Sequence, residues 1–270
     1  MSTYPAPQIT QQHRSLRAPL PAATEAAPAP ALETLLASFP NLPARTAILG
    51  VGRDGLPVLF DLQDDRPGAI LICADRAAGK TGLLQTLLLS TLALSLPHEA
   101  QFVVIAAAES EWDWLTGDPL AGRYVLDVAL PHDPAAAGWI LRLAGMAEAR
   151  SKGLQSGPTL LLLLDGVEFL AEADAGVRTA FEYLLANGPA VGIWPVGTLT
   201  PAAGRLHPLA GRFQTHILGR IRDREVARSF GLTGDAAYEA LQAGARFAVL
   251  VNADWFVFDL PALEESQTWR

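Results

Sequence analysis

The chain is poor in cysteine and histidine, and each shortage excludes a class of protein. Its 270 residues include one cysteine, Cys73, so the chain itself holds neither a disulfide framework nor a cysteine metal site. The five histidines are scattered without the spacing of metal ligands. The amino terminus also has no apolar signal core. We therefore expect a protein of a reducing compartment, the cytoplasm.

Long hydrophobic runs are absent as well. The longest, residues 82–96, is shorter than the ~20 residues of a membrane-spanning helix and is interrupted by Gln85. This run therefore predicts a buried helix, and we expect no membrane segment.

Positive charge is in deficit, because the formal net charge is −8. Contacts to nucleic-acid phosphates need clustered Lys and Arg, so the composition as a whole does not favour nucleic-acid binding. Net charge says little about a local patch or about the central channel of an oligomer. With 50% hydrophobic and 18% charged residues, the chain has the composition of a globular protein with a well-supplied core.

Lysine is scarcer still, since only Lys80 and Lys152 occur among the 20 basic residues. The chain carries Arg almost everywhere that a positive charge is needed. Lys80 is therefore interpreted as a position where Arg would not serve. A phosphate-binding loop is such a position, because a compact ammonium on a thin stem reaches the phosphates where a planar guanidinium would crowd the loop.

Apolar runs alternate with helical patterns along most of the chain, which predicts an α/β fold of three layers with a mostly parallel central sheet and a small β-hairpin before it. Residues 1–30, rich in Pro and Ala, are expected to be a disordered arm, and residues 31–270 a single domain. Strands are expected at 69–73, 101–108, 158–165, 190–198 and 212–221, helices at 31–39, 80–96, 133–150, 175–188, 223–230 and 235–244, and hairpins at 45–62 and 245–260.

The segment "ADRAAGKT" nearly matches the phosphate-loop pattern G-x-x-x-x-G-K-[ST] (the Walker A motif), with Ala74 in place of the first glycine. An apolar strand precedes it and a helix follows, which is the context that the loop requires. Alanine keeps its amide and serves at the loop entrance if its φ is negative. The residues predicted to bind the nucleotide are Ala74, Asp75, Arg76, Ala77, Ala78, Gly79, Lys80, Thr81 and Gly82.

The apolar strand "LLLLLD" ends at Asp165 and supplies the carboxylate that such a loop needs opposite its hydroxyl. We expect Thr81 and Asp165 to hold Mg²⁺ beside ATP. Many ATPases carry a catalytic Glu directly after this Asp, but here the next residue is Gly166. Glu168 and Glu109 are the candidates to act with Asp165 in catalysis, and solvated loop acids are the alternative interpretation of Glu109 and Glu111. Nucleotide binding is thus better supported than hydrolysis.

Several segments together resemble the motor domain of the FtsK/SpoIIIE–HerA ATPases. The resemblance covers residues 45–260 and rests on "AILGVGRDGLPVLFDL" before the phosphate loop, on "FVVIAAAESEWDWL" and "VALPHDPAAAGWILRLAGMAEAR" after it, and on "LLLLLDGVEFL" and "AVGIWPVGTLTP". Four departures mark a divergent member. These are Ala74, the triple alanine 106–108 in place of D-P-K, Gly166, and Leu199 at the family's sensor Gln, with Thr198 and Thr200 beside it.

The resemblance implies a RecA-like core that assembles into a hexameric ring with ATP and Mg²⁺ between subunits. A neighbouring subunit would complete each site with an arginine. Double-stranded DNA would pass through the ring and touch loops such as 151–157 and 200–212. The candidates for the arginine in trans are Arg212, Arg220, Arg222 and Arg224.

Three functions stay open at this point. The first is an ATP-driven motor subunit that translocates or processes DNA, with hydrolysis slowed by the missing Glu. The second is a nucleotide-binding assembly or regulatory subunit that hydrolyses little. The third is a motor acting on protein in secretion, because that branch shares the same fold.

Overall fold

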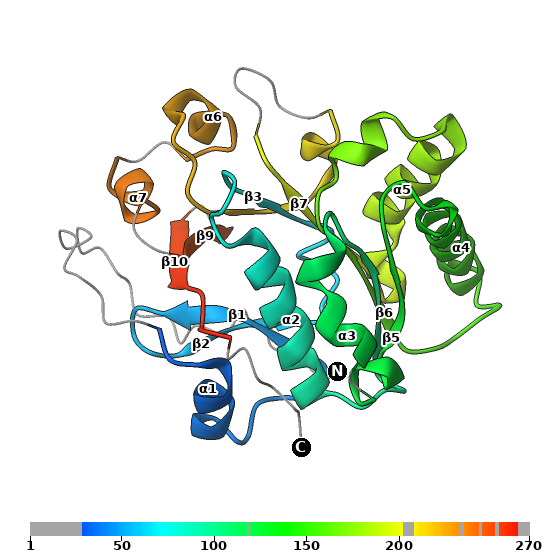
Figure 1. Cartoon of the computed structure of the whole chain (residues 1–270), viewed down its shortest axis with the longest axis horizontal. Helices are drawn as coiled ribbons and strands as arrows, with labels where there is room; N and C mark the ends of the chain where they lie inside the picture. Colours follow the sequence, from blue (N-terminus) through cyan, green and yellow to red (C-terminus); the bar gives the residue numbers. More distant parts are fainter. Residues whose placement is uncertain are drawn as a thin grey trace, which may run out of the picture.

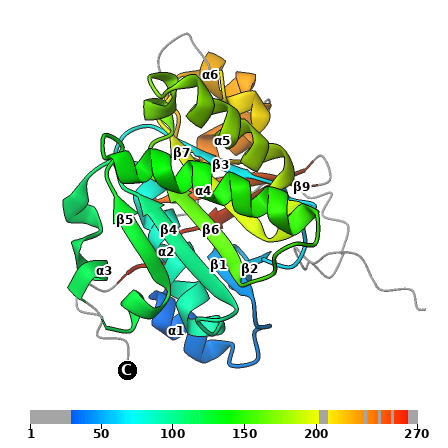
Figure 2. The ribbon, with the colours of Figure 1, turned by 90° about the vertical axis from the view of Figure 1, so that its right-hand side faces the viewer.

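The chain forms one sheet with helices on both of its faces (Figures 1 and 2). The computed structural model describes residues 29–117, 119–201, 208–232, 235–242, 245–251 and 254–263. Most of the arm expected at residues 1–30 lies outside these ranges, so the arm and the domain division stay predictions.

The ten strands lie in the order β2-β1-β10-β9-β8-β3-β7-β6-β4-β5. The strands from β8 to β5 in this order run parallel, whereas β2, β1, β10 and β9 pair antiparallel and extend the same sheet. The expected α/β architecture is thus confirmed, and the early hairpin is part of the main sheet. The strands are β1 (Thr46–Gly52), β2 (Pro57–Asp61), β3 (Ile70–Cys73), β4 (Ala100–Ile105), β5 (Val125–Ala129), β6 (Thr159–Leu164), β7 (Ile193–Leu199), β8 (Thr215–Leu218), β9 (Arg246–Val251) and β10 (Asp254–Asp259).

Successive side chains of the central strands enter two separate cores, one on each face. Leu71 and Leu162 face one core and Ile72 and Leu161 face the other, as strand alternation requires. Both cores exclude water, which explains the continuous apolar runs in the sequence. The first core is covered by α4 (Pro134–Ser151), α5 (Ala175–Asn187) and α6 (Arg224–Ser229), and the second by α1 (Leu32–Ser38), α2 (Lys80–Leu94) and α3 (Asp113–Gly117); α7 (Asp235–Ala240) lies beside β10.

Helix α2 is apolar around its whole circumference because it is enclosed on several sides. It contacts β4 and β7 of the parallel part, β1 of the hairpin, and α1. Its leucines Leu83, Leu84, Leu87 and Leu88 are all fully buried. The helix that follows the phosphate loop is therefore fixed by packing along its length.

One strand was missed by the sequence analysis. β5, Val125–Ala129, pairs parallel with β4 at the edge of the sheet, where its side chains are only partly buried. Asp127 lies in its middle and accepts a hydrogen bond from Trp139 Nε1 at 2.6 Å, so the segment lacks a strand-like apolar run. The expected strand 101–108 is also shorter, since β4 ends at Ile105.

The parallel strands bring several loops to one edge of the sheet. β3, β4, β6, β7 and β8 all end there, and β3 lies between β7 and β8. In open α/β sheets, ligands bind beyond the carboxyl ends of the strands. The residues that follow these strands therefore define the candidate site.

Candidate functional site

The segment after β3 turns sharply and leads straight into α2. Ala77 and Gly79 have positive φ angles of 53° and 88°, and α2 begins at Lys80. Left-handed residues in such a turn direct successive amides to one side, and the helix amino terminus adds a positive partial charge. The loop 74–79 therefore has the backbone form of an anion cradle.

Lys80 is folded back into this loop. Its Nζ donates hydrogen bonds to the carbonyl oxygens of Ala74 and Asp75, both at 2.9 Å. Burial lowers the pKa of Lys80, and the carboxylates of Glu168 and Asp165 partly oppose that shift. The ammonium thus lies within the loop, where it would meet a bound phosphate.

Asp165 is held between two threonine hydroxyls. Thr81 Oγ1 donates to Asp165 Oδ2 at 2.9 Å, and Thr198 Oγ1 donates to Asp165 Oδ1 at 3.1 Å. Asp165 and Thr198 are buried, with exposed fractions of 5% and 1%. The structure therefore brings together the hydroxyl and carboxylate that the sequence pattern paired, and it adds Thr198 from the end of β7.

These oxygens fit a magnesium ion. A hydroxyl and a carboxylate are hard oxygen ligands, which Mg²⁺ prefers in combination with water and phosphate oxygens. Thr81 and Asp165 would hold the ion, and Thr198 would orient the carboxylate. When bound, the ion would neutralise charge on the terminal phosphates.

The residue after Asp165 has a backbone conformation that excludes most side chains. Gly166 has a φ angle of 101°, in the region that favours glycine. Two residues on, Glu168 begins the short helix η3 (Glu168–Ala171), and its Oε1 accepts a hydrogen bond from the Thr200 amide at 2.7 Å. Glu168 thus reaches the edge of the sheet that carries the loop.

Ala74 is accommodated by a second glycine that the sequence analysis did not connect with it. Its φ is not among the positive values, so its methyl group causes no backbone strain. The methyl is fully buried, and a Cβ added at Gly219 would lie only 2.9 Å from the Ala74 Cβ. Gly219, after β8, therefore provides the space that Ala74 needs.

The segment 219–222 also forms hydrogen bonds that hold the loop in place. The Asp75 amide donates to the Arg220 carbonyl at 2.8 Å, and the Arg222 amide donates to Asp75 Oδ2 at 2.9 Å. Arg220 Nη2 donates a hydrogen bond to the Ala77 carbonyl oxygen at 3.4 Å, while its Nε is buried and has no hydrogen-bond partner among the described residues. Arg220 therefore lies against the loop of its own subunit.

The other expected arginines differ in their surroundings. Arg212 lies 4.0 Å from Glu182, and Arg224 is bound by Asp235 and Glu239 and stacks on the Tyr238 ring. The Arg222 side chain is exposed, and its guanidinium has no hydrogen bond to another described residue.

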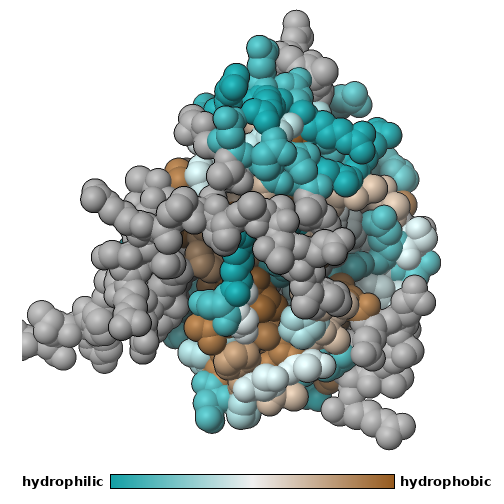
Figure 3. Space-filling model, turned by 90° about the vertical axis from the view of Figure 1, so that its left-hand side faces the viewer, coloured by the Kyte–Doolittle hydropathy of each residue, from teal (hydrophilic) through white to brown (hydrophobic). Residues whose placement is uncertain are grey.

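Hydrophilic side chains gather at the top of the face in Figure 3, the end of the molecule where Figure 1 places α6.

Three other positions from the sequence analysis add no described side chain to the site. The backbone of Glu109 begins the short helix η1 (Glu109–Glu111), but its side chain lies outside the described residues. Leu199 is buried in the core, and its carbonyl accepts a hydrogen bond from the Ala74 amide at 3.2 Å. Residues 202–207 of the expected substrate loop 200–212 lie outside the described ranges.

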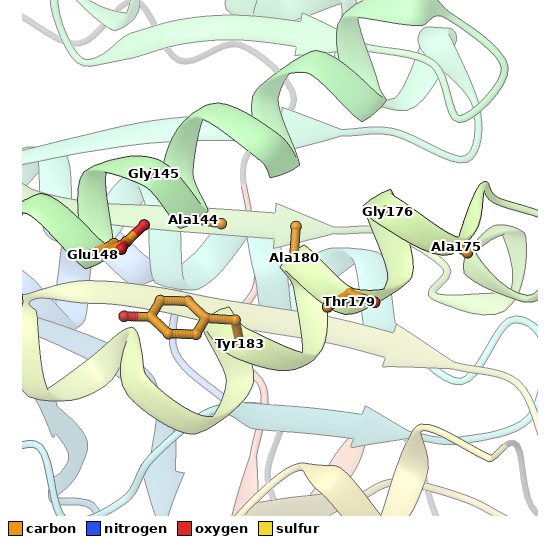
Figure 4. A pocket seen from close by; sticks show the side chains of 8 residues that line it. All are labelled: Ala144, Gly145, Glu148, Ala175, Gly176, Thr179, Ala180 and Tyr183. Carbon is orange, nitrogen blue, oxygen red and sulfur yellow. The ribbon is translucent and has the colours of Figure 1, made fainter.

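A hollow outside the loop lies between α4 and α5 (Figure 4). It has a volume of about 490 Å³ and is lined mainly by small residues, with Tyr183 and Glu148 at one end. Glu148 is paired with Lys152 at 2.5 Å. The lining residues are Ala144, Gly145, Glu148, Ala175, Gly176, Thr179, Ala180 and Tyr183.

No protein-family model and no curated protein sequence matches the chain. Among solved structures, it is similar to EccC (ATPases 2 and 3) of Thermomonospora curvata in complex with a signal sequence peptide. The TM-score is 0.68 and the identity 20%, over 88% of this chain and 44% of that one. EssC (ATPases 2 and 3) of Geobacillus thermodenitrificans gives a TM-score of 0.66 at 18% identity, over 92% and 49%.

The pCW3 conjugation coupling protein TcpA with ATPγS gives a TM-score of 0.65 at 16% identity, over 83% of this chain and 68% of that one. The chain spans less than half of the EccC and EssC chains. The chain therefore has the fold of these proteins, which confirms, at the level of the fold, the expected resemblance to the FtsK/SpoIIIE type. Among the described residues, no helix has both the length and the apolar character needed to span a bilayer.

Proposed function

We propose that the chain is a divergent FtsK/HerA-like ATPase subunit that binds ATP and Mg²⁺ at residues 74–82. The observation that carries the proposal is the hydrogen bond between Thr81 and Asp165, 2.9 Å long, at the foot of a loop that already encloses Lys80. Such an arrangement binds a nucleoside triphosphate through the loop amides, the lysine ammonium and an ion held by the two oxygens.

We further propose that the subunit uses ATP to move a polymer, either DNA or protein. The structural neighbours include a protein named as a secretion ATPase and one named as a conjugation coupling protein with ATPγS. The proposed form is an oligomeric, hexameric ring in the cytoplasm that uses ATP to translocate or process double-stranded DNA. The arginine of a neighbouring subunit would complete each site.

A motor acting on protein is the second candidate, and one observation favours it. The net charge is −8, and loop 151–157 carries one basic residue, Lys152, which is paired with Glu148. A DNA channel needs cationic side chains that are free to meet phosphates. The third candidate, a subunit that binds ATP and hydrolyses little, rests on Gly166, Leu199 and the triple alanine 106–108.

The direct test measures ATP affinity by calorimetry and phosphate release with and without double-stranded DNA. Lys80→Ala should weaken ATP binding about 10- to 100-fold, because it removes a charged donor to the phosphates. For ATP affinity, Lys152→Ala is the matched control, since it replaces the other lysine, which is exposed and lies at the C-cap of α4. Equal ATP affinity of Lys80→Ala and the native chain would refute the site.

The substrate arms of the same test separate the candidates. Stimulation of phosphate release by DNA supports the DNA motor. An ATP turnover rate that does not change when DNA is added, together with no DNA binding at low salt, supports the protein motor. Tight ATP binding without turnover under any condition supports the third candidate.

A further inference from the structure

We propose that Glu168 is the carboxylate that accepts the proton of the attacking water in ATP hydrolysis, acting from two residues beyond the position that follows Asp165. The inference rests on the proposed function and deepens it, because it assigns the chemical step to a residue.

Position 166 cannot carry this carboxylate without strain. A φ of 101° is one that L side chains rarely adopt, so a glutamate there would have to change the turn between β6 and η3. That turn is fixed on both sides, because the Asp165 amide donates to the Ile105 carbonyl and the Val167 amide to the Thr198 carbonyl, at 2.8 and 2.9 Å. The turn therefore requires glycine.

The Glu168 carboxylate occupies the space beside that glycine. A Cβ placed on Gly166 would lie 3.1 Å from Glu168 Oε2. The side chain of Glu168 thus folds back along the turn, so that its oxygen lies next to the point where a side chain of residue 166 would begin. The carboxylate reaches the neighbourhood of Asp165 from residue 168 instead.

Glu168 is also electrostatically close to the loop. Like Asp165, Glu168 lies close enough to Lys80 for its negative charge to act on the ammonium. Because Lys80 binds the terminal phosphates of a nucleotide in such loops, a carboxylate near its ammonium is near the phosphorus that water attacks.

The three described carboxylates whose charges act on Lys80 differ in their hydrogen bonds and in their place in the fold. Asp165 accepts hydrogen bonds on both oxygens, from Thr81 and Thr198. Asp75 accepts the Arg222 amide through Oδ2 and is thereby tied to the segment 219–222. Glu168 uses Oε1 to accept the Thr200 amide, and among the described residues Oε2 has no hydrogen-bond donor. Oε2 is therefore the oxygen available to a water.

In the proposed hydrolysis step, every bond and proton is accounted for. The oxygen of water forms a bond to the γ-phosphorus of ATP, and its proton passes to Glu168 Oε2. The bond between the γ-phosphorus and the bridging oxygen breaks, and its electron pair stays on ADP. Glu168 then releases the proton to solvent. The Thr200 amide holds the carboxylate in place through Oε1 during the cycle.

The test compares Glu168→Gln with Glu172→Gln, which replaces an exposed glutamate just after η3. Glutamine still accepts from the Thr200 amide but takes no proton. In Glu168→Gln we expect ATPγS affinity within about threefold of the native chain and turnover lowered about 100-fold or more. After incubation with ATP and desalting, Glu168→Gln should retain ATP, whereas the native chain and Glu172→Gln should retain ADP.

Different failures have different meanings. If the native chain binds no ATP, the proposed function itself is wrong. If it binds ATP but does not hydrolyse it, the role of Glu168 is wrong and the third candidate function holds in place of the motor. If it hydrolyses ATP no faster than Glu168→Gln does, only the role of Glu168 is wrong. The double variant Gly166→Glu with Glu168→Gln should remain inactive, and its recovery of turnover would overturn the argument from the backbone.

Discussion

At the scale of the residue, the site depends on hydroxyl groups and glycines as much as on charge. Thr81 and Thr198 occupy both oxygens of Asp165 from two different elements. Gly166 and Gly219 create the turn and the space that the neighbouring acid and the loop require. The positions of the charged groups are therefore set by small neutral neighbours.

Thr198→Ala should weaken magnesium-dependent ATP binding, because Asp165 loses the donor that orients it. Residues that support metal ligands typically contribute about 10- to 100-fold to metal affinity. The measurement is ATP affinity as a function of Mg²⁺ concentration. Thr198→Ser keeps the hydroxyl and should behave like the native chain. An unchanged magnesium dependence in Thr198→Ala would show that the hydroxyl has no positioning role.

Gly166→Ala should lower the free energy of unfolding by about 1–3 kcal/mol, because a side chain is forced into a positive-φ conformation. Gly138→Ala is the matched control, since Gly138 lies inside α4 and no described atom is within 4 Å of an added Cβ. It should stabilise the chain by about 0.5–1 kcal/mol. Denaturant unfolding of both variants measures the difference, and equal stabilities would contradict it.

Cys73 should be nearly inert in the folded chain. Burial raises the pKa of its thiol from 9.0 to about 12, so the reactive thiolate is scarce at pH 8 and increases as the pH rises towards that value. Alkylation at pH 8 should be about 1000-fold slower than in denaturant, from the pKa difference alone. Since Cys73 directly precedes the loop, ATP should slow labelling further. Rapid labelling of the native chain would contradict this burial.

At the scale of the element, α2 is joined to β1 by a buried hydrogen bond at an irregular point of the sheet. The register between β1 and β2 shifts between Ile48 and Gly50, and there the Ile48 amide donates to Ser90 Oγ at 2.8 Å. The helix that follows the phosphate loop is thus tied to the antiparallel part of the sheet through a polar contact as well as through leucines.

Ser90→Ala should destabilise the chain by about 1–3 kcal/mol, because it leaves a buried amide without an acceptor. Ser95→Ala is the matched control, since Ser95 caps the end of the same helix and its buried hydroxyl has no hydrogen-bond partner within the described part of the chain. That second variant should change stability by little. Thermal and denaturant unfolding of the pair checks the prediction, and equal losses would assign the effect to packing alone.

The sequence predicted those parts of the site that lie close together in the chain. The strand, loop and helix around Lys80 form one local pattern, and the run ending at Asp165 is continuous because both of its faces are buried. Thr198 lies near the end of β7 and Gly219 directly follows β8, so their contacts with Asp165 and Ala74 depend on the order β8-β3-β7-β6, which local patterns do not encode. β5 was missed because edge strands lack a fully buried face.

At the scale of the whole molecule, one end of the sheet gathers the loop, the carboxylates and the segment 219–222. Arg220 is engaged with its own loop, and Arg212 and Arg224 have acidic neighbours within the same chain. The exposed Arg222 therefore best meets the requirement of an arginine that acts on a second subunit. If the proposed ring forms, Arg222 would complete the site of the adjacent copy.

This arrangement predicts complementation between two inactive variants. Arg222→Ala should bind ATP normally but lose turnover, whereas Lys80→Ala should bind ATP poorly. In a mixed ring, the loop of an Arg222→Ala subunit meets the intact arginine of a Lys80→Ala neighbour, so roughly a quarter of the interfaces in a one-to-one mixture become complete. Mass measured with ATPγS should report the oligomer, and phosphate release should rise on mixing. Arg228→Ala, an exposed arginine of α6, should leave turnover unchanged. If mixing restores nothing while both variants assemble, Arg222 does not act across the interface.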